Sequence, residues 1–410
     1  MSQQNKNTKY RGLTRRKFIG GGIAVGTAVA TLPSISGCKS NNKGDAPVTG
    51  DPQVIEDASQ YLSVPDEFKT SDEKVEPTAT YELPLGCIPI YSDGAFAAVL
   101  QAGGAIGTTL SLLNVNSGVL TCIFSSATQG LNFEIHDACA NDTLLVWTEI
   151  NYVTQDWKLC VQAMDSGSVV GDIVVIDSGD KNWDPPRMSV FEDKVIWLHM
   201  PSLYGEHASD SSFCYLYRRN DSAETKDVVW KSEGRFATTP TISDGYVTIT
   251  PRVLQEEGTF YALTVVDLSS DNYSQVDQLV MPAGIRPFAA TYWNERFVFS
   301  VEASYEFGGL FGSMGTYIGH PGETYLVIPY EPEAAATGFG DLVAVKVRSS
   351  HYLIDTKDES FRVVLCPDRS LNWGDFPANT NAASKLITYA TCRDLATGKP
   401  ANVTVRIFDL

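Results

Sequence analysis

The sequence predicts an all-β fold, a β-propeller of seven four-stranded blades closed by an N-terminal strand. Three observations predict it. From about residue 79 onward, short runs rich in β-branched and aromatic residues alternate with turns, and no long amphipathic helical pattern interrupts them. A two-residue turn followed by a strongly apolar run recurs about every fifty residues. One further strand-like run, residues 78–83, precedes the first of these units.

The repeated turn sets the number of blades. Consecutive strong copies begin 48, 51, 52 and 50 positions apart, and a four-stranded propeller blade has about this length. Two weaker copies at residues 340–341 and 383–384 raise the number of units to seven. Six or eight blades are alternatives, because residues 302–323 form a long insertion in the fifth unit. The strong turns begin at Asp93, Asn141, Glu192, Asp244 and Asn294.

The two ends of this region predict how the ring closes. The seventh unit has only three strands of its own and ends in residues 403–408. If the strand-like run 78–83 pairs with that unit, it completes the last blade and protects both edges. The propeller is therefore expected to span residues 79–410.

The N-terminal segment, residues 1–37, has the parts of an export signal. A basic leader without acidic residues is followed by a short uncharged run rich in Gly and Ala. The leader resembles a twin-arginine signal through Arg15 and Arg16, and residues 35–38 resemble a lipoprotein cleavage box. The resemblance implies export in the folded state, cleavage before Cys38, and a lipid anchor on Cys38 at the outer side of the cytoplasmic membrane or in the cell envelope.

A transmembrane anchor is the alternative interpretation of this segment. The apolar run from Phe18 to Leu32 is 15 residues long, whereas a helix that crosses a bilayer needs roughly 20. The sequence therefore favours a cleaved signal. Residues 38–78 are polar and rich in Asn, Asp, Pro and Ser, which predicts a flexible tether between the lipid and the propeller.

The charge of the chain restricts its partners. Residues 1–37 hold six of the 31 Lys and Arg residues and none of the 49 acidic ones, so the remainder has 25 basic against 49 acidic residues, a net charge of −24. Such a surface repels phosphate backbones and anionic lipid headgroups. We therefore expect no nucleic-acid partner and membrane attachment only through the lipid on Cys38. The expected partner is an unidentified glycan, peptide or envelope protein.

Several repeats resemble a known family. Residues 141–147 continuing to 157–167, and residues 240–247, look like the repeats of TolB-type propellers, which occur in bacterial and archaeal envelope proteins. The resemblance covers most of residues 79–410 at the level of the fold. The signature motifs of WD-repeat, kelch and sialidase propellers are absent from the sequence.

The long connections between blades hold the candidate binding residues. Long loops on a rigid ring are the usual place for binding, and Trp, Asp and Arg together can stack a ligand face and orient polar groups. The alternative is that the Trp residues cap blade interfaces and the Asp residues hold turns. The candidates are Trp183, Asp184, Arg187, Trp373, Asp375, Glu134 and His136, with Arg235 and Arg286 in neighbouring connections.

Catalytic signatures are sparse. The five histidines form no metal-binding pair, and Gly312-Ser-Met-Gly315 does not have the spacing of a nucleophile elbow, so the sequence predicts no metal and no cofactor. Glu134 and His136 lie two apart on a strand and could act as an acid/base pair. We expect a binding or interaction module. The alternatives are a polysaccharide- or peptide-cleaving hydrolase or lyase that uses Glu134, His136, Asp184 and Asp375, and a purely structural envelope protein.

Overall fold

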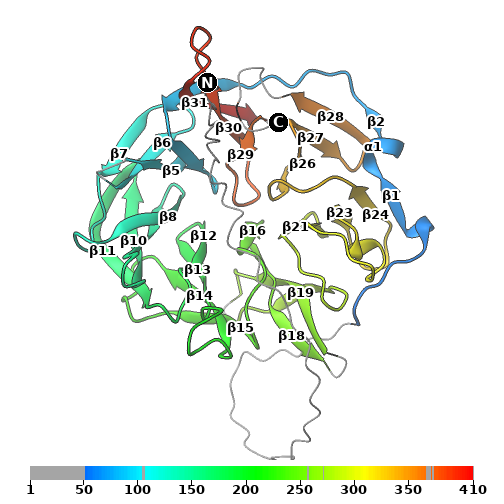
Figure 1. The fold of residues 1–410 in the computed structure, drawn as a ribbon, viewed down its shortest axis with the longest axis horizontal. Helices are drawn as coiled ribbons and strands as arrows, with labels where there is room; N and C mark the ends of the chain where they lie inside the picture. Colours follow the sequence, from blue (N-terminus) through cyan, green and yellow to red (C-terminus); the bar gives the residue numbers. More distant parts are fainter. Residues whose placement is uncertain are drawn as a thin grey trace, which may run out of the picture. The chain divides into compact units, whose positions relative to one another are not determined.

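Seven antiparallel sheets follow one another along the chain and stand around a common centre, as predicted for a seven-bladed β-propeller (Figure 1). The computed structural model describes residues 51–103, 107–255, 258–270, 272–365, 371 and 374–409. They belong to the unit formed by residues 44–410. Within these ranges no helix has the length and apolar character needed to cross a membrane. The predicted signal residues Arg15 and Arg16 and the lipidation residue Cys38 lie outside the described residues.

The first three blades are built from consecutive strands, which follow one another from the innermost to the outermost position of each sheet. Blade one contains β4 (Cys87–Ile90), β5 (Phe96–Ala102), β6 (Thr108–Asn114) and β7 (Leu120–Phe124). Blade two contains β8 (Glu134–Ala140), β9 (Leu144–Ile150), β10 (Trp157–Asp165) and β11 (Ser168–Gly179). Blade three contains β12 (Arg187–Phe191), β13 (Lys194–His199), β14 (Ser212–Arg218) and β15 (Asp227–Ser232).

The next three blades follow the same order. Blade four contains β16 (Thr241–Ser243), β17 (Tyr246–Ile249), β19 (Gly258–Asp267) and β20 (Gln275–Val280), and β18 (Arg252–Gln255) pairs with β19. Blade five contains β21 (Ala289–Trp293), β22 (Arg296–Val301), β23 (Gly315–Gly319) and β24 (Tyr325–Ile328), with the 3-10 helix η4 (Leu310–Gly312) between β22 and β23. Blade six contains β25 (Thr337–Phe339), β26 (Leu342–Val347), β27 (Ser350–Asp355) and β28 (Ser360–Leu365).

Blade seven closes the ring with strands from both ends of the domain. It contains β29 (Phe376–Pro377), β30 (Lys385–Arg393) and β31 (Pro400–Asp409), and β3 (Ala79–Pro84) supplies the outer strand. The strands β3 and β31 pair antiparallel, from Ala79 opposite Ile407 to Pro84 opposite Asn402. The predicted closure by an N-terminal strand is confirmed.

The core lies between neighbouring blades. The second strand of blade two, β9, is buried along its whole length, because blades cover both of its faces. One cluster joins Val146 and Trp157 of blade two to Met188 and Trp197 of blade three. Each blade therefore buries its apolar side chains against its neighbours, which explains why the repeated strands are strongly apolar.

The segment before blade one differs from the predicted tether. Residues 51–78 run along the outer edges of blades four to six, and we call this segment the belt (Figure 1). It contains η2 (Ala58–Gln60), β1 (Tyr61–Ser63), which pairs parallel with β24, α1 (Val64–Glu67), and β2 (Lys69–Thr70), which pairs parallel with β28.

The belt is held by side chains as well as by strand pairing. Val64 is fully buried and packs with Phe68 into the cluster between blades five and six. The prediction of a flexible tether is therefore wrong for residues 51–78, because the buried side chains of Ile55, Val64 and Phe68 and the free edges of β24 and β28 hold the segment against the ring. Residues 38–50 of the predicted tether lie outside the described part.

A loop of blade seven crosses the centre of the ring. Residues 378–384 connect β29 to β30, and Asn381 in this loop reaches blades three and four on the far side. Its side chain accepts hydrogen bonds from Ile242 N (3.1 Å) and Ser189 Oγ (2.8 Å) and donates one to Val190 O (3.1 Å). We call residues 378–384 the plug loop, because Asn381 bonds this loop of blade seven to blades three and four across the ring.

Blade six buries a histidine beside a lysine. His351 is 1% exposed and lies opposite Lys346, itself 2% exposed, in the β26–β27 ladder. The Lys346 ammonium donates to Arg348 O and lies 5.0 Å from the ring centre of Phe376. Burial, with the charge of Lys346, lowers the pKa of His351 to about 3.

This histidine predicts an acid-labile ring. As the pH falls from about 6.5 to 4, the unfolded chain binds a proton at His351 and the folded chain does not, so the free energy of unfolding falls by about 3 kcal/mol from this group. His351→Leu is expected to remove that part of the pH dependence in urea unfolding between pH 7 and pH 4. His207→Leu, which removes an exposed histidine, is the control for the substitution itself.

Candidate functional site

The ring has two unlike faces, because all connections of one kind lie at the same end of the strands. The turns between first and second strands and between third and fourth strands lie on one face, which we call the tight-turn face. The inter-blade connections and the loops between second and third strands lie on the other, the long-loop face. The candidate residues Trp183, Asp184 and Arg187 lie on the long-loop face, between β11 and β12 or at the start of β12.

Three arginines converge on the long-loop face. Arg187 Nη1 donates to Ala237 O at 2.9 Å, and Arg286 Nη2 donates to the same oxygen at 3.3 Å. Arg235 pairs with the Asp184 carboxylate. These residues come from three successive inter-blade connections, so the fold gathers side chains that are about fifty positions apart. We call Arg187, Arg235 and Arg286 the arginine cluster.

Trp183 packs away from the arginine cluster. Its ring centre lies 4.4 Å from that of His199 and 5.3 Å from that of His207, with the second pair stacked. Its backbone oxygen accepts a hydrogen bond from Trp157 Nε1 at 2.8 Å. The side chain is half-buried against the core between blades two and three, so it caps that interface and keeps part of its ring exposed.

A buried carboxylate fixes the surroundings of Trp183. Asp177 lies 2.9 Å from His199 Nδ1, accepts from Trp197 Nε1 at 2.7 Å and pairs with Lys226 at 3.1 Å. Burial raises the pKa of Asp177, but the hydrogen bonds and charges of His199, Lys226 and Trp197 outweigh it, and the net pKa is lowered. Sequence reasoning missed this network, because its members lie on β11, β13 and the β14–β15 loop.

Glu134 and His136 lie together on blade two. Both are exposed and flank the buried Ile135 on β8, whose register shifts between Ile135 and Asp137. The Nδ1 atom of His136 lies 3.0 Å from Tyr152 Oη. Glu134 borders a shallow cavity of about 410 Å³ that also includes the exposed Leu131 and Val153.

Asp375 is buried in the last blade. It is 4% exposed, accepts a hydrogen bond from Thr388 Oγ1 at 3.0 Å and pairs with Arg406 at 2.5 Å. The carboxylate therefore joins the residue before β29 to β30 and β31 within blade seven. Trp373 lies outside the described residues. The structure thus brings Asp184 and Arg187 together with Arg235 and Arg286, but it places Glu134 and His136 on blade two and Asp375 in blade seven.

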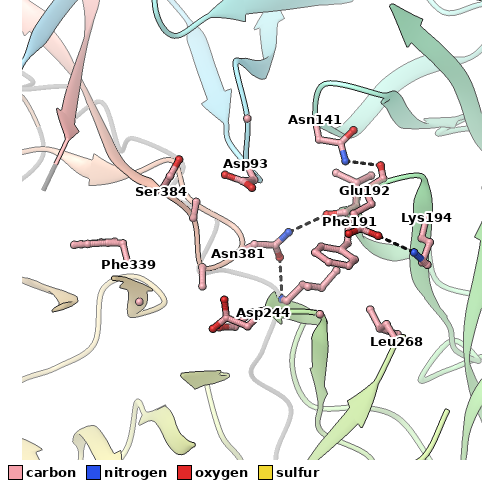
Figure 2. Close-up of a pocket in the computed structure, with 18 of the residues that line it drawn as sticks. Asp93, Asn141, Phe191, Glu192, Lys194, Asp244, Leu268, Phe339, Asn381 and Ser384 are labelled. Carbon is pink, nitrogen blue, oxygen red and sulfur yellow. Dashed lines mark hydrogen bonds and ion pairs between the residues drawn. The ribbon is translucent and has the colours of Figure 1, made fainter. Parts of the chain in front are cut away.

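A large cavity lies on the opposite face and was not predicted. A depression of about 1190 Å³ occupies the centre of the tight-turn face, and first-to-second-strand turns of all seven blades line it (Figure 2). Asn381 of the plug loop lies at its centre. The regular spacing of the turns in the sequence could have predicted this depression, because seven equivalent turns in a ring lie on the same face of the ring.

Most acidic side chains of this depression have structural partners. Asp142 accepts a hydrogen bond from Ala95 N at 2.7 Å, which joins blades one and two. Glu192 pairs with Lys194 at 3.0 Å, and Asp341 pairs with Lys357 at 2.6 Å. These carboxylates hold turns to one another or to neighbouring lysines. Across the described part of the chain, no three His, Cys, Asp or Glu residues gather as metal ligands would.

Large exposed apolar side chains are concentrated on the long-loop face. Ten large ones lie in its connections, whereas Val119 is the one in the turns of the opposite face, among the residues that the structure describes. Tyr204 is 95% exposed and Phe307 is 55% exposed. The ten are Leu85, Leu131, Tyr152, Val153, Leu203, Tyr204, Phe288, Phe307, Tyr330 and Leu395.

Comparison with known proteins gives weak similarities. No family model and no curated protein matches the chain. Among solved structures, a prolyl endopeptidase is similar at 11% identity and a TM-score of 0.48, with 80% of this chain and 50% of that chain covered. A puromycin hydrolase mutant complexed with PGG is similar at 13% identity and a TM-score of 0.48, with 83% and 56% covered.

A third similar structure is the β-propeller domain of the Trilobed protease from Pyrococcus furiosus, at 10% identity and a TM-score of 0.45, with 78% of this chain and 94% of that one covered. The chain spans about half the length of the prolyl endopeptidase and the puromycin hydrolase. The seven-bladed fold follows from the strand pairing of this chain, and these similarities assign it no activity.

Proposed function

We propose that this protein is a lipid-anchored, extracytoplasmic propeller that binds a protein or peptide partner through its long-loop face. The observation that carries the proposal is the unequal distribution of exposed apolar side chains between the two faces. Aromatic residues and arginine are enriched where proteins bind one another, and this face presents the exposed Tyr152, Tyr204 and Phe307 as well as the arginine cluster. A rigid ring displays such side chains without an ordering cost for its scaffold.

The start of the belt supports a membrane-facing orientation for this surface. Gln53 N donates to Val280 O at 3.0 Å, and Ile55 O accepts from Leu310 N at 2.8 Å, so the chain enters the ring at the long-loop face. Twelve residues lie between Cys38 and Asp51, so these two residues are about 45 Å apart at most when the chain is extended. A lipid on Cys38 would therefore keep the long-loop face close to the membrane and to partners held there.

The hydrolase alternative gains no support from the carboxylates named for it. Asp184 is paired with Arg235, and Asp375 is buried and paired with Arg406. A pair of catalytic carboxylates must face one substrate bond from a few ångströms away. Asp375 bonds to other residues of blade seven, whereas Glu134 lies on blade two, so these two carboxylates belong to different blades.

Site-specific photocrosslinking in the native envelope tests the proposal. A photoreactive phenylalanine analogue at Tyr204 or Phe307 is expected to capture the same protein from both positions. The matched control places the analogue at Val119, which is 58% exposed on the tight-turn face. Capture of that protein from Val119 as readily as from Tyr204, or no common product from Tyr204 and Phe307, would count against binding through the long-loop face.

The lipid anchor gives a separate prediction. Cys38→Ser is expected to release the protein from the membrane fraction without a change in its unfolding midpoint, because acyl chains supply the membrane affinity of an acidic domain. Cys122→Ser, at the exposed cysteine of β7, is the control and should stay with the membrane. Fractionation and thermal unfolding of the two variants make the measurement, and a Cys38→Ser protein that still sediments with membranes contradicts the anchor.

A further inference from the structure

We infer that the arginine cluster recognises a carboxylate of the bound peptide or protein. The inference rests on the proposed function and names the chemical group that this face selects. The observation behind it is that Arg187, from the connection before blade three, and Arg286, from the connection after blade four, share one backbone oxygen. Two cations therefore share one neutral acceptor, and neither forms an ion pair with a carboxylate in the described part of the protein.

The partners of the three guanidinium groups show which of the three positive charges is neutralised by an ion pair. Arg235 is neutralised by Asp184 and also donates to Pro201 O. Neither Arg187 nor Arg286 forms an ion pair with any described carboxylate, although acidic residues outnumber basic ones in the chain, 49 to 31. Each guanidinium carries five N–H donors, and one hydrogen bond is seen for each of these two arginines.

The backbone around the shared oxygen is rigid. Ala237 N donates to Thr250 O at 3.0 Å, and Thr238 N donates to Thr250 Oγ1 at 2.8 Å. Phe236, which precedes Ala237, is 1% exposed and packs in the core between blades three and four. The carbonyl is therefore fixed in place, and it holds the two guanidinium groups close together before any ligand arrives. Preorganised donors of this kind lower the cost of binding.

The electrostatics favour an incoming anion. Burial lowers the pKa of the Arg187 guanidinium, and the positive charges of Arg286 and Arg235 lower it further, by more than Asp184 and Tyr261 raise it. A carboxylate placed between Arg187 and Arg286 would relieve this repulsion and accept paired hydrogen bonds from planar donors that match its geometry. Arg286 is exposed, so one side of the cluster is open to solvent.

A carboxylate fits better than a polyanion. The surface around the cluster belongs to a strongly acidic domain, which repels extended chains of phosphates. A single carboxylate, from an Asp or Glu side chain or from a peptide C-terminus, brings one charge to two free cations. The apolar Phe288, two residues after Arg286 and 37% exposed, can contact the neighbouring part of the peptide.

Binding to defined hexapeptide libraries tests the inference on the full chain carrying Cys38→Ser. One library has Asp or Glu at one position and an amidated end, a second is neutral with a free C-terminal carboxylate, and a third is neutral and amidated. Trigalacturonate serves as a carbohydrate carboxylate. We expect binding to the first or second library, which separates the two sources of the group, and none to the third library or to trigalacturonate.

Charge-removing variants then test the residues. Arg187→Gln and Arg286→Gln should each weaken peptide binding by about tenfold or more, the effect of losing one charge-assisted hydrogen-bonded pair. The matched control, Arg296→Gln, removes an arginine paired with Glu323 at 3.3 Å on blade five and should leave binding unchanged. If Arg187→Gln does not fold, the peptide affinity of the Arg286→Gln variant alone decides the test, because Arg286 is exposed.

Four outcomes overturn the inference: equal binding of neutral amidated peptides, binding of trigalacturonate alone, no binding in any library at millimolar peptide, and arginine variants that match Arg296→Gln. Failure of the inference is separable from failure of the proposed function. If Tyr204 still captures its protein in an Arg286→Gln chain, the long-loop face binds a partner and the arginine cluster does not select it. If wild-type protein captures nothing from Tyr204, the proposed function itself fails.

Discussion

Replacing Asn381 by alanine is expected to destabilise the whole ring by about 4 kcal/mol. The side chain makes three hydrogen bonds to blades three and four, and the groups it contacts are buried. Its loss leaves Ile242 N, Ser189 Oγ and Val190 O without that partner, and an unsatisfied buried polar group costs about 1–3 kcal/mol. Urea unfolding of the purified chain measures the change.

Asn379→Ala separates the cross-ring effect from a local one. Asn379 is buried in the same plug loop, but it bonds Lys385 O at 2.8 Å and Ile387 N at 2.9 Å, both within blade seven. Hydrogen exchange at the Ile242 amide should accelerate in Asn381→Ala and stay slow in Asn379→Ala. If the Ile242 amide exchanges at the same rate in both variants, the plug loop does not couple opposite blades.

Local turn chemistry explains why the blades could be predicted. Asp244 and Gly245 both adopt positive φ, 48° and 81°, as the tight hairpin turns with the correct twist require. Asn294 and Glu295 do the same, at 47° and 59°. Each inner hairpin is thus encoded by a few adjacent residues, and the apolar strand that follows marks the surface covered by the next blade.

The belt and the plug loop could not be predicted in the same way. Val64 and Phe68 are single apolar residues in a polar stretch, and their partners lie in blades five and six, more than two hundred positions away. Asn381 lies in a polar run that looks like an ordinary loop. Its role depends on the diameter of the ring, which sets whether a loop of blade seven can reach β12 and β16.

The candidate site was predicted in part, for a similar reason. The sequence could place Trp183, Asp184 and Arg187 in the long connection before blade three, because the strands on either side were clear. It could not show that Arg187 and Arg286 share Ala237 O or that Asp375 is paired with Arg406, since those contacts depend on how connections and strands pack. The depression on the tight-turn face also becomes visible only when the turns are arranged in a ring.

Ring closure should be the largest single contribution to stability. A chain that begins at residue 85 lacks the belt and β3, whereas a chain that begins at residue 79 lacks only the belt. The difference in stability between these two chains measures the contribution of β3 alone. This contribution consists of the β3–β31 pairing, from Ala79–Ile407 to Pro84–Asn402, and the buried side chain of Leu83. We expect the shorter chain to be less stable by about 5 kcal/mol or more, because it loses strand hydrogen bonds, a core leucine and the protection of the β31 edge.

The loss should be global, because both edges of the ring depend on one strand. Unfolding of the shorter chain, followed by fluorescence and circular dichroism, should remain a single transition at a lower urea concentration, since each blade is held by its neighbours. If the shorter chain does not fold alone, a synthetic peptide of residues 78–84 added in excess should restore the transition, because it can pair with β31. Equal midpoints for the two chains, or no effect of the peptide on an unfolded shorter chain, would show that β3 does not close the ring energetically.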